Sequence, residues 1–167
     1  YVDHTKEINS VYALVPIIVY AYYKNGENLS EKEINKAVKW FYYSQIRQRY
    51  ISQLQQKLDK DVKIAANEEN PFDQMINQIS IDRPLEISKE EFIGATVSNA
   101  LWGLMRFYFK SKEAKCLTTG VNIRTKMGKK YSLEWDHIFP YSVLKQNGYS
   151  MNVSKKYSLA QEITNRA

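Results

Sequence analysis

Apolar residues recur at helical spacing through the first 110 residues, and short polar breaks separate the runs. The run over 6–24 is dense in aliphatic and aromatic residues and is followed by an Asn-Gly pair, a common helix stop. Ser30 and Glu33 then have the spacing of a capping box, and apolar residues recur at helical spacing as far as Leu58. The pattern predicts a buried helix over the first run and a single long helix over the second.

Two further helices are expected before residue 110. Asn70 precedes a proline, which is favoured at the first position of a helix, so a short helix is predicted over 71–79. An Asp-Arg-Pro tripeptide then breaks it. Ser88 and Glu91 repeat the capping-box spacing, and the broad apolar surface that follows predicts one buried helix ending near Lys110. Because no long alternating strand occurs in this part, it is predicted to be all-α.

The composition changes after residue 110, where the basic residues concentrate. Residues 1–109 hold 13 Lys and Arg against 14 Asp and Glu, whereas residues 110–167 hold 11 against 4, a net charge of +7. A concentrated basic surface is typical of nucleic-acid binders, because neutralised phosphates release counterions. A lysine-rich face that only contacts solvent is the alternative. The candidate nucleic-acid-binding residues are Lys110, Lys112, Lys115, Arg124, Lys126, Lys129, Lys130 and Arg166.

Several classes of protein are disfavoured by what the chain lacks. Its single cysteine, Cys116, excludes an internal disulfide and a cysteine-based zinc cluster, and it fits a reducing cytosol. The most apolar stretch, 11–23, is too short to span a bilayer and contains Pro16 and four tyrosines, so a core helix is expected. No glycine-rich phosphate loop is present, so nucleotide hydrolysis is not expected from this chain. These features favour a cytoplasmic protein without membrane contact.

The chain has two histidines, and they differ in their neighbours. His4 lies among polar residues and is expected in solvent. His137 follows Asp136 at the end of a predicted strand over 130–135, and the Ile-Phe-Pro that follows should end the strand. A neutral imidazole can take a proton from an attacking water, while a neighbouring carboxylate holds a divalent cation against the scissile phosphate. An Asp-His pair is also common by chance, so its wider sequence context matters.

Three pieces of the C-terminal segment follow one another in a recognisable order. They are EWDHIFP over 134–140, a predicted short helix over 141–147 closed by Gly148, and EITNR over 162–166. Together they resemble the ββα-metal finger of HNH endonucleases, in particular the C-terminal nuclease region of GmrSD-type, modification-dependent restriction endonucleases. The resemblance covers residues 131–167.

The resemblance implies a role for three residues. Asp136 would bind a divalent metal, Mg²⁺ or Mn²⁺, His137 would be the general base, and Asn165 would brace the loop. It also implies DNA as substrate, restriction of modified phage DNA as biological role, and an N-terminal ParB-like nucleotide-hydrolysing domain that has no counterpart in this chain. In HNH sites a third motif residue follows the second strand, and this sequence ends at Ala167. An incomplete finger is therefore expected, with little cleavage by the chain on its own.

The sequence thus predicts a mainly α protein, with a helical bundle over 1–110 and a basic loop plus partial ββα-metal (HNH) finger over 111–167. A weaker likeness to the same proteins covers the helix containing Trp40, Arg47 and Arg49, with the ring expected in the core and the arginines in solvent. The function indicated is metal-dependent hydrolysis of DNA. The alternatives are a non-catalytic nucleic-acid-binding helical module and a helical interaction domain whose Asp-His pair is incidental. Metal-stimulated nicking and DNA binding at low salt separate the three.

Overall fold

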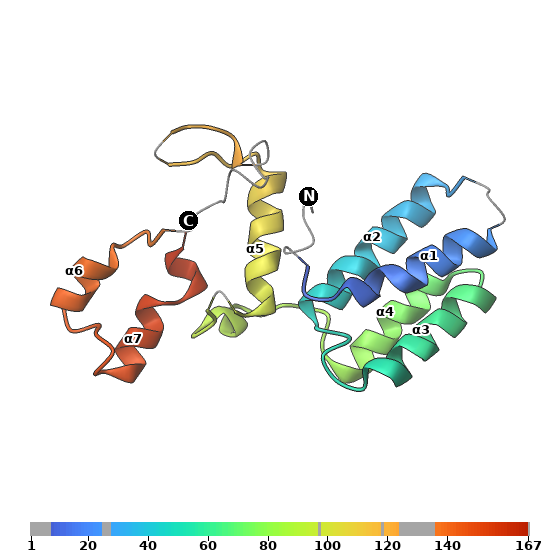
Figure 1. Cartoon of the computed structure of the whole chain (residues 1–167), viewed down its shortest axis with the longest axis horizontal. Helices are drawn as coiled ribbons and strands as arrows, with labels where there is room; N and C mark the ends of the chain where they lie inside the picture. Colours follow the sequence, from blue (N-terminus) through green and yellow to red (C-terminus); the bar gives the residue numbers. More distant parts are fainter. Residues whose placement is uncertain (1–7, 25–27, 97, 118, 124–135, 167) are drawn as a thin grey trace. The chain divides into compact units, whose positions relative to one another are not determined.

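The described part of the protein is mainly helical (Figure 1). A computed structural model describes residues 8–24, 28–96, 98–117, 119–123 and 136–166. They belong to two compact units, one of Ile8–Glu86 and the other containing Ile87–Ala167. Within the described residues, no helix has the length and apolar character that crossing a membrane requires. The helices of the described residues confirm the predicted helical class.

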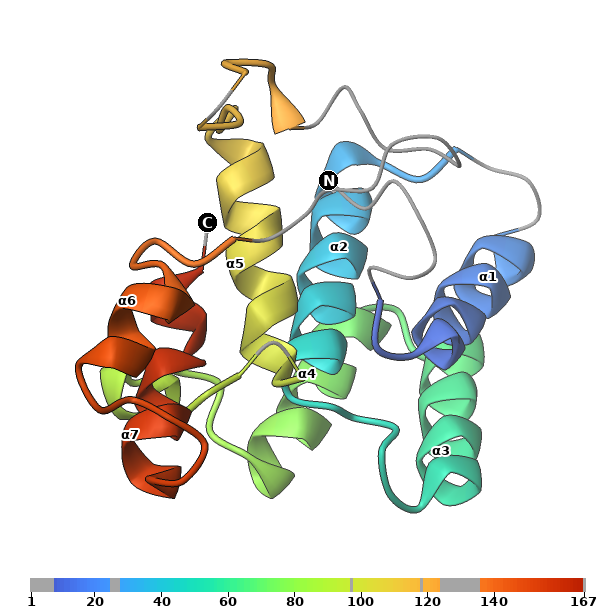
Figure 2. The same ribbon diagram turned by 60° about the vertical axis from the view of Figure 1, so that its left-hand side comes forward.

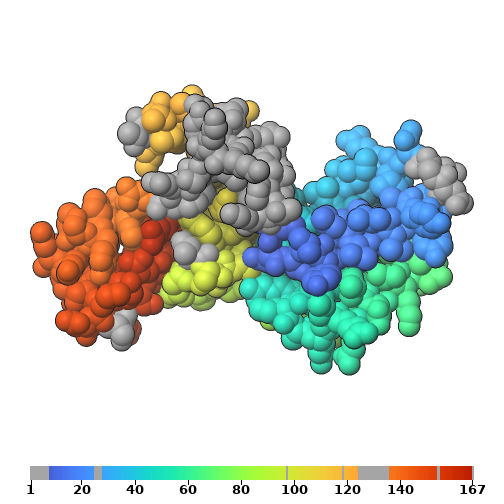
Figure 3. Space-filling model, in the orientation of Figure 1, coloured from blue at the N-terminus to red at the C-terminus, as the bar shows by residue number. Residues whose placement is uncertain are grey.

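The unit of residues 8–86 is a bundle of helices around one core. A short 3₁₀ turn leads into the first helix, and the elements are η2 (Val11–Ala13), α1 (Leu14–Tyr23), α2 (Glu31–Ile46), α3 (Leu54–Asn67) and α4 (Pro71–Asp82). Helix α1 packs against α3, and α2 packs against α4, as the turned view in Figure 2 shows. The atoms of these helices close against one another on the face seen in Figure 3. The core residues are Ala13, Tyr20, Ala37, Trp40, Tyr50, Ala65, Phe72, Met75, Ile76 and Ile79.

The predicted start of α2 is confirmed by its capping box. Ser30 Oγ accepts a hydrogen bond from the backbone N–H of Glu33, and Glu33 Oε2 accepts one from Ser30 N at 2.8 Å. The other Glu33 oxygen accepts a hydrogen bond from the Tyr20 hydroxyl and lies 2.9 Å from Lys24 Nζ. The cap therefore also ties the end of α1 to the start of α2.

The single helix expected from 30 to 58 is wrong, because the chain turns between α2 and α3. Gln48 and Gln53 adopt left-handed backbone angles, with φ of 51° and 52°. The turn carries Arg49 into the interior, where its guanidinium binds the buried carboxylate of Asp61 on α3 at 3.0 Å. Helical periodicity does not indicate this turn, because the partner of Arg49 lies on the next helix. The expectation of solvated arginines is also wrong, since Arg47 and Arg49 are buried.

The second unit begins with a 3₁₀ turn where a long helix was expected. Its elements are η3 (Lys89–Phe92), α5 (Ala100–Ser111), α6 (Tyr141–Gln146), α7 (Ser154–Ala160) and η5 (Ile163–Asn165). The capping box at Ser88 is present, but the chain leaves the helical path at Ile93, which is extended, and Gly94 follows with a φ of 74°. Asn99 then caps α5 by accepting a hydrogen bond from Leu101 N at 2.9 Å. The prediction of one helix from Ser88 to Lys110 is therefore wrong.

Hydrogen bonds to the C-terminal segment explain this break. Gly94 N donates to a carboxylate oxygen of Glu162 at 2.7 Å, and Ile163 N donates to the backbone oxygen of Ala95 at 2.8 Å. These backbone groups are not available to continue a helix. The same contacts place residues 87–110 in one unit with the C-terminal segment, so the units divide after Glu86, before the expected boundary at 110.

The described C-terminal segment contains the short helices α6 and α7, joined by turns and bends. Helix α6 matches the predicted short helix, and Gly148 closes it with a φ of 85°. Extended pairing in the described residues is limited to isolated bridges, Lys115 with Asn122 and His137 with Arg166. The ββα likeness implies a second strand before Asn165, and this is wrong because that stretch is the 3₁₀ turn η5. The first strand, expected over 130–135, lies outside the described residues, so the ββα finger is not shown.

Candidate functional site

The Asp136–His137 pair lies beside the end of the chain. His137 forms an isolated antiparallel bridge with Arg166, and Ile138 N donates a hydrogen bond to the backbone oxygen of Asn165 at 3.0 Å. Asp136 is exposed, and its Oδ1 accepts a hydrogen bond from His137 N at 2.8 Å. The structure therefore brings together the three residues that the motif singles out, although they are separated by almost 30 residues of sequence.

Asn165 holds the main chain immediately after His137. Its side chain is 9% exposed, and Oδ1 accepts a hydrogen bond from Phe139 N at 2.9 Å. The amide nitrogen donates to the backbone oxygens of Phe139 at 3.4 Å and of Ala160 at 3.1 Å. A buried amide with its donors and acceptor engaged fixes the local backbone. These are the contacts that a bracing role requires, and the catalytic importance of Asn165 stays a prediction.

Three side chains hold the His137 ring. Nε2 lies 3.3 Å from Oε1 of Gln161, and Nδ1 lies 3.4 Å from Nη1 of Arg166. Arg166 Nη2 also donates to Gln161 Oε1, so the three polar groups form a closed triangle. Tyr141, the first residue of α6, stacks on the ring with centroids 5.9 Å apart and an interplanar angle of 29°. The imidazole therefore has a defined orientation.

Sequence reasoning missed Gln161 and Tyr141. Neither residue belongs to a motif with recognisable chemistry, and Gln161 meets His137 across 24 residues of sequence. Helix α6 supplies Tyr141 and α7 supplies Tyr157, and these two rings meet edge to face at 5.8 Å. The packing of two short helices therefore places the stacking partner, and no local pattern in the sequence contains that information.

The structure places only some of the predicted phosphate-binding residues on a surface. Lys112 and Lys115 are exposed, and Lys112 Nζ lies 5.7 Å from the centre of the Tyr108 ring. Arg166 is half-buried against His137 and Gln161. Lys110 is 1% exposed, on the same buried side of α5 as Phe107, so it is not placed for phosphate contact and this expectation needs correction. The remaining candidates, Arg124, Lys126, Lys129 and Lys130, lie outside the described residues.

A divalent metal would depend on few protein ligands here. Among the described residues there is no group of three or more His, Cys, Asp and Glu side chains arranged to hold a metal ion. Mg²⁺, however, keeps several waters and is usually bound by one or two carboxylates together with substrate phosphates. The exposed carboxylate of Asp136 fits this mode of binding.

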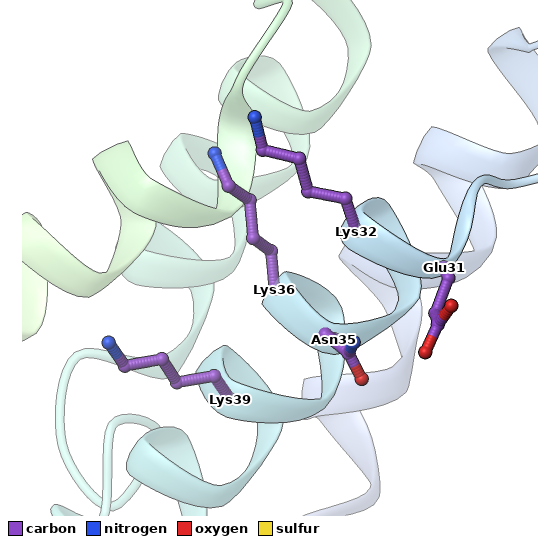
Figure 4. A pocket seen from close by; sticks show the side chains of 5 residues that line it. All are labelled: Glu31, Lys32, Asn35, Lys36 and Lys39. Atoms are coloured by element: carbon purple, nitrogen blue, oxygen red, sulfur yellow. The ribbon is translucent and has the colours of Figure 1, made fainter.

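Two hollows occur away from the Asp-His pair, on the unit of residues 8–86. One, of about 430 Å³, lies along α2, and Figure 4 shows its lysines in succession along that helix. Lys36 in this hollow forms an ion pair with Asp73 and a 3.2 Å hydrogen bond with Asn70. The other, of about 490 Å³, includes Gln48 of the α2–α3 turn in its lining. Neither hollow contains a residue that the sequence singles out.

Taken by its own geometry, the molecule is a mainly helical protein with a held imidazole next to an exposed carboxylate. This combination supplies a proton acceptor and a cation ligand at adjacent positions. No protein family, curated protein or solved structure matches the chain.

Proposed function

We propose that this chain is part of a metal-dependent HNH-type endonuclease that hydrolyses DNA phosphodiester bonds. The observation that supports this proposal is the set of hydrogen bonds by which Asn165 holds the backbone directly after Asp136 and His137. The resemblance of residues 131–167 to GmrSD-type nucleases points the same way. On this proposal the full protein acts on modified foreign DNA in the cytoplasm and includes a ParB-like nucleotide-hydrolysing domain.

Asp136, His137 and Asn165 each have a chemical role in this proposal. A Mg²⁺ or Mn²⁺ ion held by Asp136 would supply charge that polarises the scissile phosphate and stabilises the leaving oxygen. Asp136 provides a carboxylate for that ion, and its exposure leaves it accessible to substrate. His137 accepts a proton from the attacking water, and Asn165 keeps the backbone beside the ring in place.

The contacts of the ring add a condition to this role. Both nitrogens of His137 have side-chain partners, so one partner must move before the ring accepts a proton from water. Arg166 is the partner that substrate displaces, because a guanidinium binds phosphate in charge-assisted pairs that are stronger than its bond to a neutral ring. Arg166 is thus proposed to move from His137 to the DNA backbone.

The test measures nicking of supercoiled plasmid by the full protein that carries this sequence. His137→Ala is expected to lower the cleavage rate about 10²- to 10⁴-fold while DNA affinity stays nearly constant, because a general base acts on the barrier. Asp136→Ala is expected to shift the Mg²⁺ or Mn²⁺ titration of the rate to higher metal. His4→Ala, which changes the other histidine, is the matched control and keeps the wild-type rate. Cleavage by His137→Ala at the wild-type rate contradicts the proposal.

A non-catalytic nucleic-acid-binding module is the second candidate. The net charge of +7 over residues 110–167 favours it. It predicts DNA binding that weakens steeply with salt, together with no metal-stimulated nicking by the full protein.

A further inference from the structure

The donors and acceptors around His137 determine where its ring proton lies. A guanidinium carries only donors, so Nδ1 of His137, 3.4 Å from Arg166 Nη1, is the acceptor in that contact. In a neutral imidazole one nitrogen accepts and the other carries the proton. The proton therefore lies on Nε2, which faces Oε1 of Gln161 at 3.3 Å.

The hydrogen bond from Arg166 also fixes the orientation of the Gln161 amide. Arg166 Nη2 donates to Gln161 Oε1, and an amide NH₂ in that place would set donor against donor. A carbonyl oxygen has two lone pairs, so Oε1 accepts from Arg166 and from His137 Nε2 together. One arrangement of protons is compatible with all three of these contacts.

The backbone that carries Gln161 is anchored on both sides. Gln161 is the C-cap of α7, and its N–H donates to the backbone oxygens of Tyr157 and Ser158, each at 3.1 Å. Two residues later, Ile163 is fully buried and its N–H bonds to Ala95 in the segment before α5. The amide therefore reaches His137 from a fixed position.

We propose that Gln161 is a positioning residue that holds His137 as the Nε2–H tautomer and leaves Nδ1 as the proton-accepting nitrogen. A partner that fixes the tautomer and the orientation of an imidazole is a common device in functional sites. The catalytic meaning of this role rests on the proposed endonuclease function. The tautomer itself is measurable without metal, DNA or cleavage.

The experiment is ¹⁵N NMR of the imidazole ring in the purified 167-residue chain, at alkaline pH where free imidazole is neutral. A His4→Asn background leaves His137 as the one histidine of the chain. In this background the ring is expected to show a protonated Nε2 and an unprotonated Nδ1. Gln161→Leu is expected to shift the spectrum toward a mixture of both tautomers.

Two variants control for the substitution itself. Gln161→Glu keeps an acceptor oxygen at the same position and is expected to keep the Nε2–H ring. Gln146→Leu makes the same change at an exposed glutamine at the end of α6 and is expected to leave the spectrum unchanged. A ring with its proton on Nδ1 in the background chain or in Gln161→Glu overturns the proposal, whether or not Gln161→Leu folds. An unchanged tautomer in a folded Gln161→Leu chain overturns it as well.

Cleavage by the full protein separates this inference from the function on which it rests. A positioning role predicts that Gln161→Leu lowers kcat more than it changes KM. If Gln161→Leu alters the tautomer but His137→Ala still cleaves at the wild-type rate, the endonuclease proposal fails and the tautomer assignment stands. If His137→Ala abolishes cleavage and Gln161→Leu leaves the tautomer unchanged, the positioning role fails alone.

Discussion

Asp61 is the most completely buried acidic side chain among the described residues, and the α2–α3 turn is built around it. Arg49 binds both of its oxygens, Nη2 to Oδ1 at 3.0 Å and Nε to Oδ2 at 3.1 Å, and the Tyr50 hydroxyl donates to Oδ2 at 2.8 Å. Burial first, and the charge of Asp61 second, raise the pKa of Tyr50, so its phenol stays protonated as the donor. The carboxylate therefore connects α3 to the turn at two places.

Removing this carboxylate is expected to destabilise the protein strongly. Asp61→Ala leaves Arg49 buried without its main counter-ion and should lower the free energy of unfolding by about 3–5 kcal/mol, measured by urea denaturation. Tyr50→Phe removes one hydrogen bond to a charged group and should cost about 1.5–3 kcal/mol. Asp59→Ala, an exposed position on the same helix, is the matched control and should stay within about 0.5 kcal/mol. Equal effects at Asp59 and Asp61 would contradict this account.

The sequence points to candidate site residues only where the residue type itself suggests chemistry. Asp136, His137 and Asn165 stand out because carboxylate, imidazole and amide occur in a recognisable order. Gln161 does not, because a glutamine at a helix end has no signature and its partner lies 24 residues away. The charge of a residue does not show whether its side chain reaches the surface. Lys110 is basic in the sequence, yet its side chain is buried on α5. Helix orientation decides that outcome.

At the scale of the element, the cap of α2 makes stability depend on pH. Hydrogen bonds from Ser30, and then from Tyr20 and Lys24, hold the pKa of Glu33 well below its ordinary value of 4.5. A depressed pKa in the folded state adds stability that is complete above the ordinary value. It is lost as pH falls from there toward the folded value, because the unfolded chain then binds the proton more readily.

Glu33→Gln tests this linkage. The variant should unfold at a lower urea concentration than wild type near neutral pH, and the gap should narrow steadily below about pH 4.5. Glu31→Gln changes an exposed carboxylate in the same helical turn and is the matched control, with a much smaller gap. A Glu33→Gln gap that is the same at low and neutral pH would show that the charge of Glu33 plays no part.

Signals that act within one helical turn can be read from the local sequence of this protein, whereas helix breaks set by distant partners cannot. The capping boxes at Ser30 and Ser88 and the proline at the start of α4 lie where the pattern predicts, because each signal acts within one turn. The ends of α2 and of the 3₁₀ turn after Ser88 depend on partners far along the chain, Asp61 for the first and Glu162 with Ile163 for the second. Periodicity contains no information about such partners.

At the scale of the whole molecule, the two units differ sharply in charge. Residues 8–86 contain 10 Lys and Arg and 10 Asp and Glu, whereas residues 87–167 contain 13 and 6. The helical class and the charged C-terminal part are both visible in the sequence, but the division after Glu86 is not. The composition changes near residue 110, and the contacts that define the unit join residues 94–95 to 162–163.

If the chain binds DNA as proposed, this asymmetry in charge predicts which lysines affect the binding. Each phosphate contact contributes about 0.9 to the slope of log K against log salt, so Lys112→Gln with Lys115→Gln should reduce the slope by up to about 2. Lys32→Gln with Lys39→Gln removes the same charge from exposed lysines of α2 (Figure 4), in the unit with balanced charge, and should leave the slope nearly unchanged. Fluorescence anisotropy of a labelled duplex, titrated at several salt concentrations with EDTA present, measures both slopes. Equal losses for the two pairs would mean that binding follows total charge, and the basic C-terminal segment would then have no special role.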